Sequence, residues 1–169
     1  KTKLATTLKN GIIIDLRTPS VIADSPDPRI NGVANLNYPV TAAASAKGYV
    51  DSFVNDAAVR KQFGLAITKI ANTSGPVLIH CTAGKDRTGW LSSMLLYAAG
   101  ASDKQVMTEY LKSNDAGSDF SVDKTWLNAA LTAARKNNGG SIMTYITSSS
   151  NGLGVSQDTI AKLKAKISK

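Results

Sequence analysis

The sequence predicts an α/β fold in which helices flank a small, mostly parallel sheet. Two short apolar runs, residues 12–14 and 76–79, have the length of buried strands, and the first is wholly β-branched. Between and after these runs, apolar residues recur at helical spacing. An alternation of strands and helices is typical of parallel strands whose connecting helices cover the sheet.

The first half of the chain supplies the predicted sheet. Residues 1–10 fit the end of a helix that Gly11 stops, and residues 12–14 form a strand that leads into Asp15. Three prolines make residues 18–32 a loop, and residues 33–40 form a second strand. Residues 42–48 fit either a loop or a helix, and residues 49–54 fit a helical turn. A longer helix, ending before residues 72–75, has the apolar stripe Val59, Phe63, Ala66, Ile67 and Ile70.

The second half is predicted to be helical. A helix over residues 90–99 stops at Gly100, and Ser102 with Gln105 forms a capping box for the next helix. A polar linker over residues 114–119 leads to a helix capped by Ser121, then a short helix, then a last helix capped by Ser156. Their inward residues are Val122, Trp126, Ala130 and Ala134, then Ile142, Met143 and Ile146, then Ile160, Leu163 and Ile167. Since no repeat or domain boundary is visible, we expect residues 1–169 to form a single domain.

The composition narrows the possible classes of protein. No apolar run approaches the roughly 20 residues of a membrane-spanning helix. Twenty Lys and Arg residues against twelve Asp and Glu give a net charge of +8. This charge either steers acidic substrates toward a site or belongs to a solvated C-terminal helix with Lys162, Lys164, Lys166 and Lys169. No basic run is interleaved with aromatic residues, which disfavours nucleic acid as a partner.

Residues 80–89, HCTAGKDRTG, stand between the predicted strand 76–79 and the helix 90–99. A strand–loop–helix unit directs its loop N–H groups and the helix N-terminus at one spot, which attracts anions and favours a thiolate. Arg87 lies six positions after Cys81, so its guanidinium can fold back and bind two phosphate oxygens. This pattern predicts a cysteine-dependent phosphatase loop.

Three other interpretations of these residues are weaker. Cys81 and His80 are the single Cys and His of the chain and cannot form a zinc site alone, so no metal or other cofactor is expected. A structural cysteine would not call for Arg87 six residues later. The glycines do not match a Walker loop, which ends in Gly-Lys-Ser/Thr.

Each residue of the loop has an expected task in phosphoryl transfer. Cys81 is the nucleophile, and Arg87 and the loop N–H groups meet charge on the phosphate oxygens. His80 orients the base of the loop, and the Thr88 hydroxyl stabilises the sulfur as a leaving group. Lys85 adds a second positive group, useful for a substrate with several phosphates. The remaining substrate-binding positions of the loop are Thr82, Ala83 and Gly84.

The general acid is less clearly indicated. Asp86 lies within the loop and can reach the ester oxygen, whereas Asp51 lies on an upstream segment, as the acid of other cysteine phosphatases does. Asp24 and Asp27 are more simply interpreted as surface carboxylates. Asp15 ends a strand beside that of Cys81, so it either faces the site or pairs with Arg17.

At residues 80–89 the chain resembles the signature of atypical bacterial tyrosine phosphatases related to the secreted mycobacterial phosphatase B, members of the tyrosine phosphatase superfamily. Residues 13–17 match the family's Asp-Leu-Arg strand, and residues 140–153 with the last helix match its usual ending. The resemblance implies a tyrosine phosphatase-like fold, with Cys81 as nucleophile, Arg87 as phosphate clamp and Asp86 as acid. It implies phosphotyrosine, phosphoserine, phosphothreonine and phosphoinositide substrates.

The resemblance departs from the family at the front of the chain, where an Asn-Phe-Arg-Asp-Leu-Gly-like stretch is expected and not found; we therefore expect the phosphatase domain to lack an N-terminal segment. A monomer is expected, and the compartment stays open between the bacterial cytoplasm and secretion. Two other functions remain: a phosphate-ester binding module without turnover, and a sulfur-transfer or arsenate-reducing enzyme. An intact Cys81 and Arg87 disfavour the first, and the lack of further cysteines disfavours the second. Within the phosphatases, an enzyme specific for inositol phosphates or phosphoinositides is the alternative.

Overall fold

Three short parallel strands form the sheet of the protein. The computed structural model describes residues 2–116 and 120–167. The strands are β1 (Ile12–Asp15), β2 (Ala34–Asn37) and β3 (Val77–His80), in the order β2-β1-β3. Both pairings are parallel, and the register sets Asp15 opposite His80. The carboxyl ends of β1 and β3 therefore meet at one edge, where Cys81 follows.

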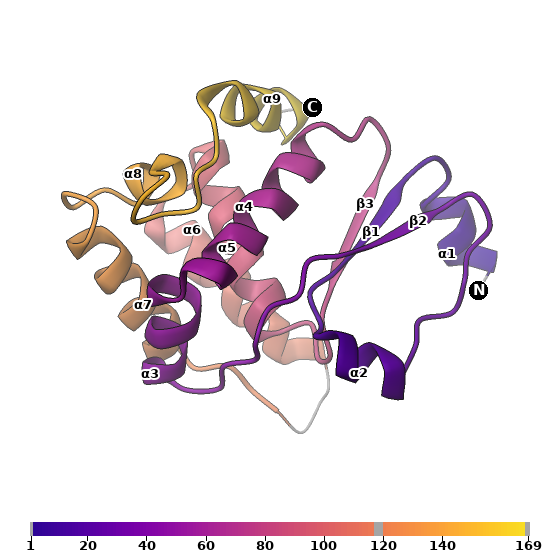
Figure 1. Ribbon diagram of the computed structural model, residues 1–169, viewed down its shortest axis with the longest axis horizontal. Coiled ribbons are helices and arrows are strands. Elements are labelled where there is room, and N and C mark those ends of the chain that lie inside the picture. The colour runs from indigo at the N-terminus through magenta and orange to yellow at the C-terminus, as the bar shows by residue number, and fades with distance from the viewer. Residues whose placement is uncertain (1, 117–119, 168–169) are drawn as a thin grey trace.

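Helices surround the sheet, as predicted for the fold class (Figure 1). In the view of Figure 1 the strands lie on the right with α1 and α2, and α4–α9 fill the centre and left. Helix α5 is the next element of the chain after β3, and α4, α6, α8 and α9 pack around it. The helical elements are α1 (Thr2–Thr7), α2 (Pro19–Asp24), α3 (Ala46–Gly48), the π-helix η1 (Tyr49–Asn55), α4 (Ala57–Ala71), α5 (Asp86–Ala99), α6 (Asp103–Lys112), the 3₁₀ helix η2 (Ser113–Ala116), α7 (Lys124–Lys136), α8 (Ile142–Thr147) and α9 (Gln157–Ile167).

Several predicted elements are confirmed. The apolar stripe of α4 is buried, and Gly100 ends α5 in the left-handed conformation that favours glycine. Ser102 and Gln105 form the predicted capping box of α6. Ser156 caps α9 by accepting a hydrogen bond from the N–H of Thr159. Within the described residues, no helix is both long and apolar enough to cross a membrane.

Other predicted elements are wrong in detail. Residues 18–32 contain the helix α2, because Pro19 occupies its first turn, where a missing N–H costs nothing. Asp123 rather than Ser121 caps α7, accepting from the N–H of Thr125 at 2.7 Å. Ile167 is 47% exposed at the end of α9 instead of facing inward. The predicted linker is partly the 3₁₀ helix η2, and its residues 117–119 lie outside the described residues, as do residues 1 and 169.

Aromatic side chains fill the space between α5 and the helices around it. Trp90 of α5 is fully buried and packs against Phe53 and Tyr145, with ring centroids 6.1 Å apart in both pairs. The Tyr145 hydroxyl donates to the carbonyl of Phe53 at 2.8 Å. These contacts join α5, α8 and η1, and therefore fix the helix that carries one side of the candidate site relative to its neighbours.

Candidate active site

The loop between β3 and α5 runs from Cys81 to Lys85, and we call residues 81–87 the phosphate loop. Gly84 adopts φ +69°, a left-handed conformation that would strain other residues. Helix α5 begins at Asp86, four residues before the predicted start, and no side chain caps it. Uncapped N–H groups of a first turn are available to an anion.

Cys81 lies at the base of this loop and is 6% exposed. Burial alone would raise the pKa of its thiol, but hydrogen bonding from Thr88, the charge of Arg87 and the N–H of Gly84 hold the pKa below its ordinary value. The buried Thr88 hydroxyl has no other hydrogen-bond partner in the described part of the chain. The lowered pKa favours a nucleophilic thiolate at Cys81.

The Arg87 side chain folds back across the phosphate loop and is buried. Its Nη2 donates to the Thr82 hydroxyl at 2.9 Å, and its Nη1 lies 3.5 Å from the carbonyl oxygen of Val40. The buried Nε has no partner among residues 2–116 and 120–167. A guanidinium held this way keeps donor capacity for a bound oxyanion.

Asp86 is half-buried in the first turn of α5. The Tyr49 hydroxyl donates to its Oδ1 at 3.1 Å. Burial raises the pKa of this carboxyl above its ordinary value, although Tyr49, Arg87 and Lys85 each act to lower it. A carboxyl with a raised pKa beside a nucleophile can carry the proton that a leaving oxygen needs.

His80 joins the phosphate loop to the sheet. Its Nδ1 lies 3.1 Å from the carbonyl oxygen of Cys81, and its Nε2 lies 3.0 Å from Oδ2 of Asp27. These two contacts fix the orientation of the ring between the phosphate loop and the proline-rich segment that carries Asp27. The expectation that Asp27 is a plain surface carboxylate is wrong, because it also pairs with Arg17 at 2.8 Å.

Asp15 is buried at the end of β1, and of its two expected positions the structure shows the ion pair with Arg17. Burial would raise the pKa of Asp15, but the side-chain and backbone hydrogen bonds of Arg17 and the charge of His80 hold the pKa below its ordinary value. Oxygen and nitrogen atoms of Asp15, Asp27 and His80 lie within 4.8 Å of one another, close enough for a metal ion. They do not fit one, since the Arg17 guanidinium already lies 2.8 Å from both carboxylates.

The remaining candidates lie in other surroundings. Lys85 is buried, and its ammonium donates to the carbonyl of Phe120, so it points into the protein. Asp51 is 52% exposed and pairs with Lys47, and Asp24 is exposed at the end of α2. Thr82, Ala83 and Gly84 are exposed at the rim of the loop.

Sequence reasoning missed Tyr49 and the role of Asp27. No motif marks Tyr49, which reaches Asp86 across 37 residues of sequence. The helical turn predicted over residues 49–54 gave its location but not the direction of its hydroxyl.

Comparison with known proteins agrees with this geometry. The sequence profile of the Tyrosine phosphatase family matches residues 1–169. A Cupriavidus necator protein named as a tyrosine-protein phosphatase is 35% identical over 82 residues, which are 46% of this chain and 30% of that protein. The triple specificity protein phosphatase PtpB of Mycobacterium tuberculosis is 49% identical over 41 residues, 24% of this chain and 15% of its own. The alignments span less than a third of either relative.

A tyrosine-protein phosphatase of Nostoc commune is 44% identical over 50 residues, 29% of this chain and 17% of that protein. The shared stretches are short, but the family profile extends over the whole sequence. The three-stranded parallel sheet with its surrounding helices is consistent with the same fold. The chain therefore belongs to the tyrosine phosphatase family.

Proposed function

We propose that the protein hydrolyses phosphate monoesters through a cysteinyl-phosphate intermediate. The observation that carries the proposal is the buried Cys81 thiol at the base of a loop that the Arg87 side chain crosses to reach Thr82, and the lowered pKa of the thiol agrees with it. Burial without such partners would have raised the pKa and left the thiol inert.

In the first step the Cys81 thiolate attacks phosphorus, an S–P bond forms, and the P–O bond to the leaving group breaks. Asp86 gives its proton to the departing oxygen. In the second step water attacks phosphorus, Asp86 takes a proton from it, and the thiolate leaves. Arg87 and the loop N–H groups stabilise charge on the phosphoryl oxygens in both steps.

Phosphotyrosine is the first substrate to expect from the family, together with phosphoserine, phosphothreonine and phosphoinositides. The word "triple" in the name of the mycobacterial relative supports a broad class. The exposed rim of Thr82, Ala83 and Gly84 also supports access by bulky esters. An enzyme restricted to inositol phosphates or phosphoinositides is the alternative, and catalytic efficiencies on a panel of phosphopeptides and phosphoinositides separate the two.

The Cys81→Ser variant tests the covalent mechanism. We expect it to lose turnover of para-nitrophenyl phosphate while still binding inorganic phosphate, because Arg87 and the loop N–H groups remain. Substantial residual hydrolysis would exclude the cysteinyl intermediate, whereas a wild type that binds phosphate without turnover would indicate a binding module. Iodoacetate should also inactivate the wild type at a pH well below 9.0, the ordinary pKa of a cysteine thiol.

A further inference from the structure

A chain of two tyrosine hydroxyls ends on the carboxyl group of Asp86. The Tyr49 hydroxyl donates to Oδ1 of Asp86 at 3.1 Å, and the Tyr110 hydroxyl lies 2.7 Å from that of Tyr49. A carboxylate accepts hydrogen bonds and donates none, so Tyr49 donates to Asp86 and its oxygen is left to accept from Tyr110. The hydrogen bonds therefore run in one direction, from Tyr110 through Tyr49 to Asp86.

Packing holds the Tyr49 ring in this position. Tyr49 is fully buried at the start of the π-helix η1, an element often found at functional sites. Its ring centroid lies 4.7 Å from Phe53, 6.4 Å from Tyr110 and 6.0 Å from Trp126. Rings from η1, α6 and α7 thus enclose it, so the hydroxyl cannot turn away from Asp86 without disturbing three neighbours.

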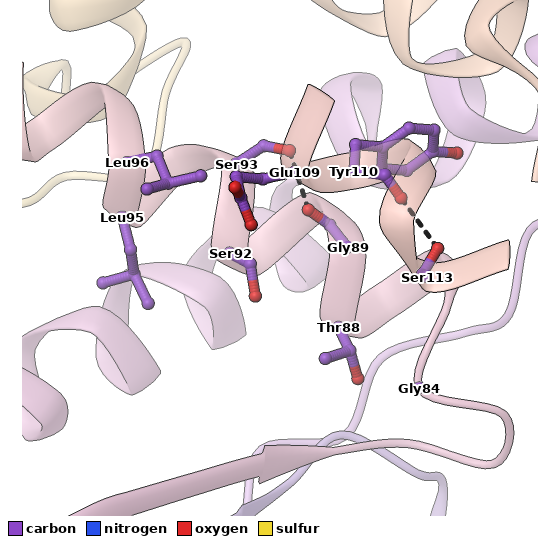
Figure 2. A pocket seen from close by; sticks show the side chains of 10 residues that line it. All are labelled: Gly84, Thr88, Gly89, Ser92, Ser93, Leu95, Leu96, Glu109, Tyr110 and Ser113. Atoms are coloured by element: carbon purple, nitrogen blue, oxygen red, sulfur yellow. Dashed lines mark hydrogen bonds between the residues drawn. The ribbon is translucent and has the colours of Figure 1, made fainter. Parts of the chain in front are cut away.

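The last residue of the HCTAGKDRTG motif, Gly89, gives Tyr110 its place. A Cβ atom at this position would lie 3.0 Å from two ring carbons of Tyr110. Figure 2 shows Tyr110 of α6 beside Gly89 of α5, where both line a cavity of about 400 Å³. Even an alanine at position 89 would require the Tyr110 ring to shift by a few tenths of an ångström. This contact gives the motif glycine a task that the phosphate loop does not explain.

We infer that Tyr49 is a positioning residue for Asp86. Tyr110 supports Tyr49 through the hydrogen bond between their hydroxyls, and Gly89, which has no side chain, leaves room for the Tyr110 ring. The hydroxyl occupies Oδ1 and leaves Oδ2 to carry the proton toward the leaving oxygen. This inference rests on the proposed function, in which Asp86 is the general acid.

The other charged groups near Asp86 fix the sign of the expected effect. Arg87 and Lys85 lower the pKa of Asp86 and stay in place when Tyr49 is changed. Burial raises the pKa of Tyr110, and the charges of Asp86 and of Asp123, at the start of α7, raise it further. The Tyr49 hydrogen bond also lowers the pKa of Asp86, so removing the hydroxyl raises that pKa further.

The Tyr49→Phe variant tests the inference because it keeps the ring and its packing. We expect turnover of a phosphotyrosine peptide to fall on the order of 10-fold, the cost of a lost hydrogen bond to a charged group. Hydrolysis of para-nitrophenyl phosphate should change little, since that leaving group departs without a proton. The basic limb of the pH profile should move to higher pH. Tyr97→Phe is the matched control, because the Tyr97 hydroxyl bonds to Asp103 instead, and its profile should equal that of the wild type.

Three outcomes separate the inference from the proposed function. Suppose that Asp86→Asn removes the basic limb of the pH profile. A folded Tyr49→Phe protein would then overturn the inference if its basic limb is not shifted, or if it slows all substrates by the same factor. If Asp86→Asn keeps the limb, the proposed acid itself is wrong. If Tyr49→Phe does not fold, Tyr110→Phe provides the second test, with a smaller limb shift in the same direction expected and no shift contradicting the inference.

Discussion

Asp15 lies beside the base of the phosphate loop and Asp86 lies within it, and their surroundings push their pKa values in opposite directions. Asp15 ends β1 beside the Arg17 guanidinium, which holds its pKa low despite burial. Asp86 begins α5 beside a neutral tyrosine hydroxyl, and burial holds its pKa high. The same side chain is therefore kept ionised on the sheet side of the loop and prepared for protonation on the helix side.

The difference shows that two separate polar networks contact the phosphate loop. On the sheet side, Arg17 forms ion pairs with Asp15 and Asp27, and His80 lies 3.0 Å from Asp27 and 3.1 Å from the carbonyl oxygen of Cys81, at the base of the loop. On the helix side, two tyrosine hydroxyls orient Asp86 without adding charge. We propose that the first network holds the nucleophile in place and the second serves proton transfer. Changes in the two should then have different signatures.

The largest expected effect comes from Arg87, whose charge lowers the pKa of both Cys81 and Asp86. Arg87→Lys keeps the charge but loses the planar fork that binds two oxygens. We expect kcat/KM to fall on the order of 10²-fold for every phosphate ester, whatever its leaving group. Steady-state kinetics on an aryl phosphate and a phosphopeptide check this, and a near-normal rate would mean that Arg87 does not contact phosphate.

Asp15→Asn should mainly reduce stability. It removes one carboxylate from the buried Arg17 and should lower the free energy of unfolding by about 3 kcal/mol at neutral pH. Because the folded pKa of Asp15 is depressed, its contribution is present above the ordinary value of 3.8 and is lost as pH falls through the folded pKa. Urea unfolding at several pH values checks this. A variant as stable as the wild type at neutral pH would show that the pair contributes nothing.

Asp86→Asn should have the opposite and smaller effect on stability. The folded pKa of Asp86 is raised, so the ionised carboxylate costs stability that grows as pH rises from 3.8 through the folded pKa. An asparagine avoids this cost and can still accept from Tyr49, so the variant should gain less than about 1 kcal/mol at neutral pH. The same urea titrations measure it. A clear loss of stability would instead make Asp86 a structural residue like Asp15.

The sequence was sufficient to predict those features that depend on residues close together in the chain. The runs at residues 12–14 and 76–79 and the Ser102 capping box are local patterns, and all appear in the structure. The phosphate loop was predicted because its residues are consecutive. Helix α2 was missed because Pro19, treated as a helix breaker, is tolerated in a first turn.

The two polar networks could not be predicted, because their members meet only in the fold. Tyr49 and Tyr110 are 61 positions apart, and no sequence pattern indicates that their hydroxyls form a hydrogen bond. Asp27 lies in a proline-rich segment that suggests a surface carboxylate, and its contacts depend on how that segment passes β3. The direction of the Lys85 side chain, toward Phe120, is likewise set by tertiary packing.

The pH dependence of kcat/KM for Asp86→Asn tests the division between the two aspartates most directly. We predict that the basic limb disappears, and that a phosphotyrosine peptide slows by on the order of 10² while para-nitrophenyl phosphate slows little. Asp51→Asn is the matched control on the same substrates, with a wild-type profile expected because Asp51 is exposed and pairs with Lys47. If Asp51→Asn shows the leaving-group dependence while Asp86→Asn slows every substrate alike, Asp51 is the acid and the account is contradicted.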